Sequence, residues 1–170
     1  IIKNGKFING KYVAKFENKF SNFIRAKYAV GYSSASTATS ALVNLLTDKD
    51  CKDEIIVPAY GPIPVSMPLL NYGKKIIYAD VNYSSHLLSK NDLLKKYNKK
   101  TKLIMPVHLF GNVFDVKDLK KDLDNKRTFV IEDASQAHGS SIHKTMAGNL
   151  GMASIFSFYP TKNLGAFGDA

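Results

Sequence analysis

The chain has 170 residues, of which 45% are hydrophobic and 22% are charged. This composition predicts a folded core and excludes a disordered chain, which carries fewer apolar residues for the same charge. A single cysteine, Cys51, excludes a disulfide framework within the chain and fits a reducing cytosol, so we expect a cytoplasmic protein. No apolar run approaches the roughly 20 residues that span a bilayer, and no signal-peptide pattern is present, so we expect no membrane partner.

The charge is strongly positive, with 24 Lys and Arg against 14 Asp and Glu and a formal net charge of +10. Most of the excess is lysine in polar stretches such as 95–100, without the aromatic interleaving or the motifs of nucleic-acid-binding domains. We therefore predict a solvated, lysine-rich surface and no nucleic-acid partner. Such a surface would still attract phosphorylated or nucleotide-linked substrates.

The first part of the chain alternates helical and extended patterns. Apolar residues recur at spacings of three and four over 11–27, which predicts an amphipathic helix, and the same period returns over 38–46. The apolar run at 54–57 predicts a buried strand that stops at Pro58. The prolines that follow predict a turn and then an irregular or proline-initiated helix within 59–73.

The alternation continues to the end of the chain. Near-continuous apolar strands separated by helices predict a mainly parallel sheet covered by helices on both faces, an α/β fold with three αβα layers. Ligands of such sheets bind at the carboxyl ends of the strands. The remaining strands are expected at 75–79, 102–107, 128–131 and about 152–157, and the remaining helices at about 90–98 and 115–124.

The strongest local signal for chemistry is SFYPTKNLG at 157–165. A lysine that follows a buried strand among aromatic residues and glycine is a candidate for a desolvated amine. Desolvation favours the neutral amine that forms an imine with a carbonyl group. From this segment alone, an ordinary surface-turn lysine at Lys162 remains the alternative.

A second signal is Asp133, which ends an apolar strand and so points into the expected ligand crevice. Opposite a pyridine nitrogen it would keep that nitrogen protonated and make the ring an electron sink. A helix cap is the alternative. A third signal is the Ser/Thr cluster at 33–37, which precedes a helical run and suits a phosphate because of its free N–H groups and the helix dipole. Plain N-capping is the alternative there.

Other site classes find no support in the sequence. The spacings of His108, His138 and His143 match no standard metal-ligand set, and Cys51 has no thiolate partner, so we predict no metal site. A Gly-x-Ser-x-Gly elbow and a Gly-x-Gly-x-x-Gly turn are both absent from the sequence.

Five stretches, in order along nearly the whole chain, resemble the sugar aminotransferase family of DegT/DnrJ type, which belongs to the fold-type I pyridoxal phosphate enzymes. The last two stretches are the most specific. The five are YAVGYSSAS at 28–36, EIIVPAY at 54–60, VHLFG at 107–111, IEDASQAHG at 131–139 and FSFYPTKNLGAFGD at 156–169.

The resemblance implies an aminotransferase that uses pyridoxal 5′-phosphate to move an amino group from glutamate or glutamine to a nucleotide-linked keto-sugar. It places that reaction in amino-sugar biosynthesis for cell-surface polysaccharides and implies a homodimer. It also implies that 1–170 is the N-terminal part of the cofactor-binding large domain, with a small C-terminal domain outside this chain. The start at Ile1 rather than Met fits a fragment.

Residue roles follow from the same resemblance. Lys162 would carry the cofactor as an internal aldimine, Asp133 would pair with the ring nitrogen, and Gln136 would contact the ring hydroxyl. The phosphate would be held by Ser36, Thr37 and Ser157. His138 would approach the substrate, with a structural hydrogen bond as the alternative.

One position departs from the family pattern. Where the family commonly stacks an aromatic residue on the cofactor ring, this chain has Pro62, and Tyr60 is the candidate substitute, with a core tyrosine as the alternative. Two rival functions remain. One is a related sugar dehydratase dependent on pyridoxal or pyridoxamine phosphate, whose members replace the lysine with histidine. The other is a non-catalytic regulatory member of the same fold.

Overall fold

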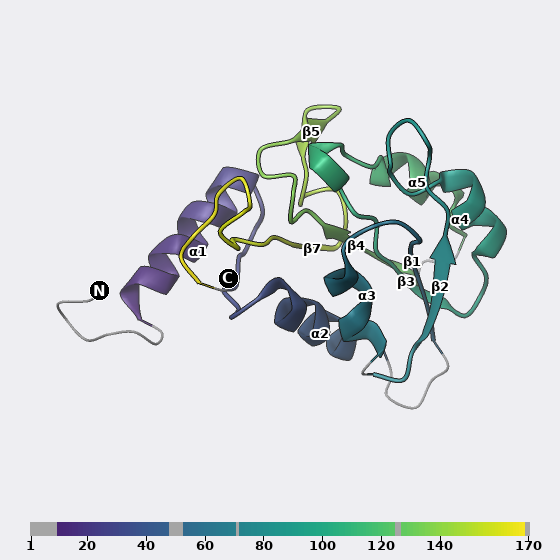
Figure 1. Ribbon diagram of the computed structural model, residues 1–170, viewed down its shortest axis with the longest axis horizontal. Coiled ribbons are helices and arrows are strands. Elements are labelled where there is room, and N and C mark those ends of the chain that lie inside the picture. Colours follow the sequence, from purple (N-terminus) through teal and green to yellow (C-terminus); the bar gives the residue numbers. More distant parts are fainter. Residues whose placement is uncertain (1–9, 48–52, 71, 125–126, 169–170) are drawn as a thin grey trace.

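The computed structural model describes residues 10–47, 53–70, 72–124 and 127–168 (Figure 1). Cys51 and Asp169, which ends the last family-like stretch, lie outside these ranges. Within them, no helix has the length and apolar character needed to cross a membrane.

Five strands form one sheet in the order β2-β1-β3-β4-β7, and every neighbouring pair is parallel. The predicted parallel sheet is therefore confirmed, with strand ends within three residues of the expected positions. The strands are β1 (Glu54–Pro58), β2 (Lys75–Ala79), β3 (Thr101–Ile104), β4 (Phe129–Asp133) and β7 (Ala153–Ile155).

Helices cover both faces of this sheet, as Figure 1 shows. Successive residues of a strand face opposite sides, so Ile131 belongs to one buried apolar cluster and Val130 to the other. Helices α2 and α3 cover the Ile131 side, whereas α4 and α5 cover the Val130 side. Their bounds are Ala35–Leu46 for α2, Ile63–Leu70 for α3, Lys90–Lys96 for α4 and Val116–Asp122 for α5.

Helix α1 (Lys11–Ile24) ends three residues before the predicted boundary. Arg25 takes a left-handed conformation with φ 58°, and the N–H of Ala26 donates to the carbonyl of Ser21 at 2.9 Å. This bond pattern closes helices, and glycine normally provides the left-handed residue. The sequence therefore gave no warning of the early end.

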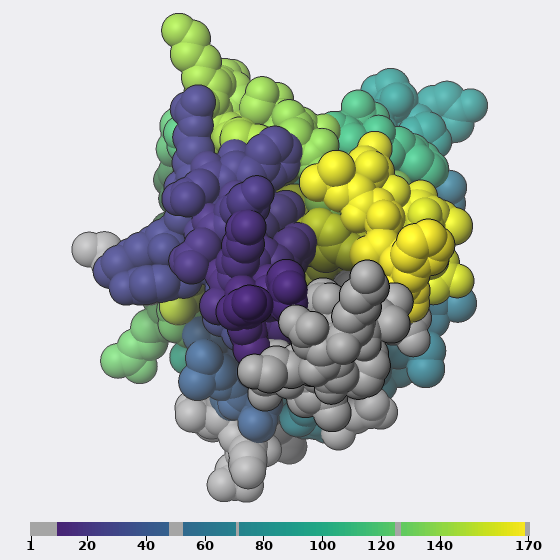
Figure 2. All heavy atoms as spheres, turned by 90° about the vertical axis from the view of Figure 1, so that its left-hand side faces the viewer, coloured from purple at the N-terminus to yellow at the C-terminus, as the bar shows by residue number. Residues whose placement is uncertain are grey.

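The aromatic side of α1 packs against the segment that follows β7. Phe20 lies 4.9 Å from Phe156 and 5.0 Å from Phe158, measured between ring centroids, and both contacts are edge-on. Figure 2 shows the two segments side by side, with α1 in purple and the end of the chain in yellow. The first helix of the chain thus covers the segment that leads to Lys162.

A hairpin of β5 (Ser141–Ile142) and β6 (Thr145–Met146) was not predicted. Its two turn residues, His143 and Lys144, have φ of 48° and 61°. Such turns usually contain asparagine or glycine, whose absence removed the signal. The 3-10 turn Leu109–Gly111 was also not predicted.

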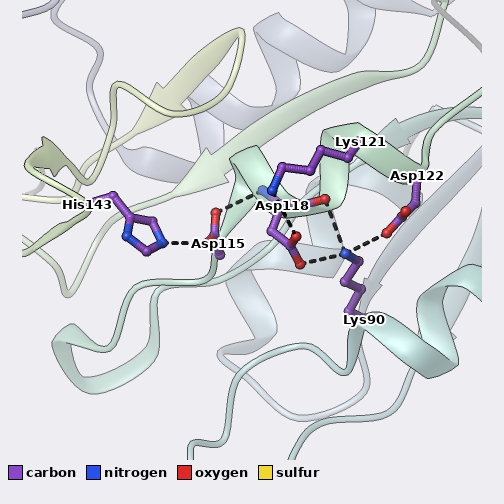
Figure 3. A network of polar contacts seen from close by, with 6 residues as sticks. All are labelled: Lys90, Asp115, Asp118, Lys121, Asp122 and His143. Atoms are coloured by element: carbon purple, nitrogen blue, oxygen red, sulfur yellow. Dashed lines mark hydrogen bonds and ion pairs between the residues drawn. The ribbon is translucent and has the colours of Figure 1, made fainter.

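An exposed polar network joins this hairpin to α5 and α4 (Figure 3). His143 contacts the carboxylate of Asp115, the N-cap of α5, at 2.9 Å. Two carboxylates of α5, those of Asp118 and Asp122, each lie 2.5 Å from the ammonium of Lys90 at the start of α4. The network joins the hairpin, α5 and α4.

Candidate functional site

Asp133 ends β4 at the carboxyl edge of the sheet, as the sequence predicted. Its N–H donates to the carbonyl of Pro106 and its carbonyl accepts from the N–H of His108, both at 2.9 Å. On the other side, the N–H of Ala134 donates to Ile155 at 2.8 Å. The backbone at Asp133 is thus fixed by both neighbouring strand segments.

The carboxylate of Asp133 is nearly buried, with the residue 8% exposed. Its Oδ1 accepts a hydrogen bond from the N–H of Ser135 at 2.9 Å. Its Oδ2 has no hydrogen-bond partner among the residues that the structure describes. This oxygen is not among the buried unpaired side-chain atoms of the described residues, so it is accessible to a cationic or N–H-bearing ligand.

Gln136 lies one turn beyond Asp133, and its amide orientation is set by a backbone contact. Its Oε1 accepts from the N–H of Phe110 at 2.9 Å, which leaves the amide NH₂ free to donate elsewhere. Phe110 has φ 56° and the next residue, Gly111, has φ 84°. A left-handed phenylalanine is strained, and strain of this kind collects at functional sites.

Lys162 lies five residues beyond Ser157, in a tight turn. The turn is closed by a bond from the N–H of Ala166 to the carbonyl of Phe158 at 2.7 Å. A Cβ at Gly165 would lie 2.4 Å from the carbonyl oxygen of Pro160, so this turn requires glycine. The side chain of Lys162 is half-buried rather than held out in solvent, and Ser157 is buried.

His138 brings the Asp133 loop and the Lys162 turn together. Its ring lies 5.2 Å from Phe156 and 5.3 Å from Phe158. Burial holds the pKa of His138 below its ordinary value; the nearby side chain of Asn163 opposes this effect, and the positive charge of Lys162 adds to it. Both ring nitrogens are buried, and neither has a well-aligned hydrogen-bond partner among the described residues.

The start of α2 shows which serine caps the helix. Ser34 is the N-cap: its hydroxyl accepts from the N–H of Thr37, and the Thr37 hydroxyl accepts from the N–H of Ser34. Plain N-capping therefore applies to Ser34 and occupies Thr37. The half-buried hydroxyl of Ser36 forms no hydrogen bond within the described part of the chain, so it remains available to a ligand.

A cavity of about 280 Å³ lies at the carboxyl end of β1. Pro62 and Val107 line it, and Val107 pairs with Asp133. Tyr60 does not line the cavity, and its ring lies 5.8 Å from that of His86, measured between centroids. The cavity therefore adjoins Asp133, although the other candidate site residues do not line it.

The sequence did not predict the pairing of two residues next to this site. His108 and Glu132 are fully buried, with His108 Nε2 2.8 Å from Glu132 Oε2. Glu132 also accepts the N–H groups of Gly148, Leu150 and Gly151 at 2.8, 2.7 and 2.6 Å. The only sequence signal was an acidic residue inside an apolar strand.

Burial raises the pKa of Glu132, but the hydrogen bonds from His108, Gly151 and Gly148 outweigh it, so the pKa of Glu132 lies below its ordinary value. The carboxylate is therefore ionised inside the core. In the described ranges, no group of three or more His, Cys, Asp and Glu side chains is placed to hold a metal ion.

A model of the DegT/DnrJ/EryC1/StrS aminotransferase family matches residues 1–170. The chain belongs to this family.

Relatives of this DegT/DnrJ-family chain include both a regulatory protein and a transaminase. A pleiotropic regulatory protein of Geobacillus stearothermophilus is 31% identical over 169 residues, which is 99% of this chain and 45% of the relative. A dTDP-3-amino-3,4,6-trideoxy-alpha-D-glucose transaminase of Micromonospora megalomicea subsp. nigra is 30% identical over 170 residues, 99% of this chain and 45% of the relative.

The fold comparison agrees. An E. coli GDP-4-keto-6-deoxy-D-mannose-3-dehydratase with bound hydrated PLP superposes with a TM-score of 0.86 at 29% identity, over 93% of this chain and 42% of the other. The DegT/DnrJ-family chain thus has the α/β fold of these enzymes and spans about 45% of the length of the relatives it matches.

Proposed function

We propose that this chain binds pyridoxal 5′-phosphate and that its protein transfers an amino group from glutamate or glutamine to a nucleotide-linked keto-sugar. The observation that carries the proposal is the pairing of Asp133 with Ile155. It sets a nearly buried carboxylate beside the strand that leads through Ser157 to Lys162. Membership of an aminotransferase family and relatives such as the Micromonospora transaminase support it.

The residues present fit the cofactor. The donor-free Oδ2 of Asp133 suits a protonated ring nitrogen, and the free amide NH₂ of Gln136 suits the ring hydroxyl. The phosphate suits the start of α2, where Ser36 has an unused hydroxyl. Thr37, whose hydroxyl is occupied, would contribute through the helix turn that it closes, and Ser157 would contribute from the end of β7.

When bound, pyridoxal phosphate supplies an aldehyde that reacts with amines and a ring that withdraws electrons from the attached carbon. Lys162 would hold the cofactor through its amine and would move the proton at the substrate carbon. Asp133 would keep the ring nitrogen protonated. Because its pKa is lowered, His138 is a neutral imidazole that can accept or donate one hydrogen bond toward the substrate side.

Pro62 would cover one face of the cofactor ring in place of an aromatic residue, since it lines the cavity next to Asp133. A pyrrolidine ring gives apolar contact without aromatic stacking. Tyr60 as a ring contact remains our prediction. Replacement of Pro62 by tryptophan tests the assignment: tighter cofactor binding supports it, and unchanged binding contradicts it.

Reductive trapping with borohydride tests the role of Lys162 directly. In the whole protein loaded with pyridoxal phosphate, peptide mapping should locate the cofactor mass on Lys162. Lys162→Ala should abolish the label, whereas Lys95→Ala, on the exposed side of α4, should leave it in place. A label on another lysine in the unaltered protein would contradict the assignment.

Turnover separates the proposed activity from its rivals, since relatives include a dehydratase and a regulatory protein. Glutamate should convert the cofactor absorbance to that of the amine form, and a nucleotide-linked keto-sugar should restore it and yield an amino sugar. A deoxy product without amino transfer indicates the dehydratase. A stable spectrum that ignores glutamate indicates the regulator.

We further propose a cytoplasmic homodimer that works in cell-surface polysaccharide biosynthesis, with a small C-terminal domain beyond residues 1–170. Exposed apolar side chains on and near α1, among them Phe23, Tyr28 and Val30, support a second protein surface there. Light scattering on the whole protein should give twice the chain mass. A monomer would contradict the homodimer.

A further inference from the structure

The tautomer of His108 follows from its contacts. Its Nδ1 accepts a hydrogen bond from the N–H of Phe114 at 3.1 Å, so the ring proton is on Nε2. That proton points to Glu132, 2.8 Å away. His108 is therefore a neutral donor with both nitrogens used, and Glu132 is an ionised acceptor.

The same histidine forms hydrogen bonds with two consecutive residues of β4. Its ring binds the side chain of Glu132, and its backbone N–H binds the carbonyl of Asp133 at 2.9 Å. Since adjacent residues of a strand face opposite sides, Glu132 points away from the ligand crevice while Asp133 points into it. Holding Glu132 thus fixes the rotation of the strand end on which Asp133 stands.

The imidazole also closes the loop that orients Gln136. Because Phe114 donates to Nδ1, the ring of His108 anchors both ends of the segment 108–114. Phe110 lies inside this segment and donates to the amide oxygen of Gln136. Loss of the ring would release the strained Phe110 and with it the amide of Gln136.

The carboxylate of Glu132 also holds the loop before β7, the strand that leads to Lys162. The N–H groups that it accepts, from Gly148, Leu150 and Gly151, precede β7 directly. A Cβ on Gly151 would lie 2.6 Å from the carbonyl oxygen of Val130, so this loop presses against β4. Strand β7 then carries the chain to Ser157 and Lys162.

We propose that His108 and Glu132 are a positioning pair: from the far side of the sheet they hold Asp133, Gln136 and the strand before Lys162 in the arrangement that a bound pyridoxal phosphate requires. The inference rests on the proposed cofactor function. Neither residue touches the cofactor, so the pair acts through the residues it holds.

The test uses the whole protein and pyridoxal phosphate labelled with ¹⁵N in the ring. In the unaltered protein, the nitrogen signal should be that of a protonated ring at pH 7.5, because Asp133 faces it. His108→Phe should shift the signal toward the unprotonated ring and weaken cofactor binding about 10-fold, the size typical when a partner behind a ligand residue is removed. Glu132→Gln, which keeps the volume, should act in the same direction.

Two measurements keep this test decisive. His143→Phe, which removes an exposed histidine–carboxylate pair of almost the same length, should change neither the nitrogen signal nor the cofactor affinity. Hydrogen exchange without cofactor should accelerate at least about 10-fold at Phe110 and Phe114 in His108→Phe, or at Gly151 in Glu132→Gln if His108→Phe does not fold.

The outcomes separate the two proposals. If unaltered protein shows no bound-cofactor signal, the proposed function is overturned and the positioning role with it. If the unaltered protein shows the signal and both variants keep it, with cofactor affinity within twofold, only the positioning role is overturned.

Discussion

Two histidine–carboxylate pairs of almost equal length lie in opposite surroundings. His108 and Glu132 are 2.8 Å apart and fully buried, whereas His143 and Asp115 are 2.9 Å apart with side chains 67% and 28% exposed. Water can replace the lost partner in the exposed pair but not in the buried pair. Two pairs of almost equal length therefore contribute very different free energies to the stability of the fold.

The two carboxylates also differ in what else they hold. Glu132 accepts three backbone N–H groups from one loop, while Asp115 accepts one, from Asp118, as a helix cap. Removal of the buried carboxylate would leave several donors without acceptors, each of which costs about 1–3 kcal/mol. The buried pair organises the ligand edge, and the exposed pair only fastens a hairpin.

Glu132→Ala should produce the largest effect. It leaves His108 and three backbone N–H groups unpaired in the core, so the free energy of unfolding should fall by about 3–5 kcal/mol. Urea unfolding followed by circular dichroism measures it. A loss below about 1 kcal/mol would erase the difference between the two pairs.

Gly151→Ala tests the loop that Glu132 holds. The new Cβ would meet the carbonyl oxygen of Val130 at 2.6 Å, and the resulting strain should cost about 1–3 kcal/mol. Gly61→Ala is the matched control, because its Cβ would meet nothing closer than 4.0 Å and its φ is not positive. Equal losses for the two variants would show that the loop yields.

Acid should separate the pairs by their response to salt. In both pairs burial raises the carboxylate pKa and hydrogen bonds outweigh it: the bonds from the Asp118 N–H and His143 lower the pKa of Asp115, and those from His108 and the glycines lower that of Glu132. A lowered folded-state pKa gives stability that is present above the unfolded-state pKa, near 4, and is lost as pH falls through the folded-state value.

The urea midpoint should therefore fall below about pH 5, and 1 M NaCl should reduce only the exposed part of that dependence. In Glu132→Gln, the part of the acid dependence that persists in 1 M salt should shrink. If salt abolished the whole pH dependence of the unaltered protein, the buried carboxylate would have no share in it.

His143→Gln should have the smallest effect, within about 0.5 kcal/mol at pH 7, because exposed pairs contribute little. Thermal unfolding in low and high salt measures it. A loss as large as that of Glu132→Ala would mean that the hairpin supports the core.

The sequence predicted what local pattern controls. Apolar runs predicted β1, β2 and β4 to within two residues, and Asp133 was predicted at the end of an apolar strand, where β4 ends. The sequence predicted the N-cap of α2 only as one residue of a Ser/Thr cluster, because Ser33, Ser34 and Ser36 have the same capping chemistry. The structure shows that Ser34 is the N-cap.

What escaped the sequence depends on distant partners or unusual backbone. The donors of Glu132 come from an irregular loop 16–19 residues further on, so no spacing rule announces them. Strand β3 stops at Ile104, before the predicted end, because Pro106 has no N–H for the ladder. Arg25, Phe110 and His143 adopt left-handed conformations without glycine.

The contact between α1 and the segment after β7 has a consequence for biosynthesis. Phe20 leaves the ribosome about 140 residues before Phe156. At a synthesis rate of roughly 5–20 residues per second, the aromatic side of α1 is made about 7–30 s before the segment around Phe156 that packs against it. In the nascent chain, the apolar side of α1 therefore stays exposed to chaperones until the segment that carries Lys162 has been synthesised. The Lys162 turn and the helix that covers it can then fold together.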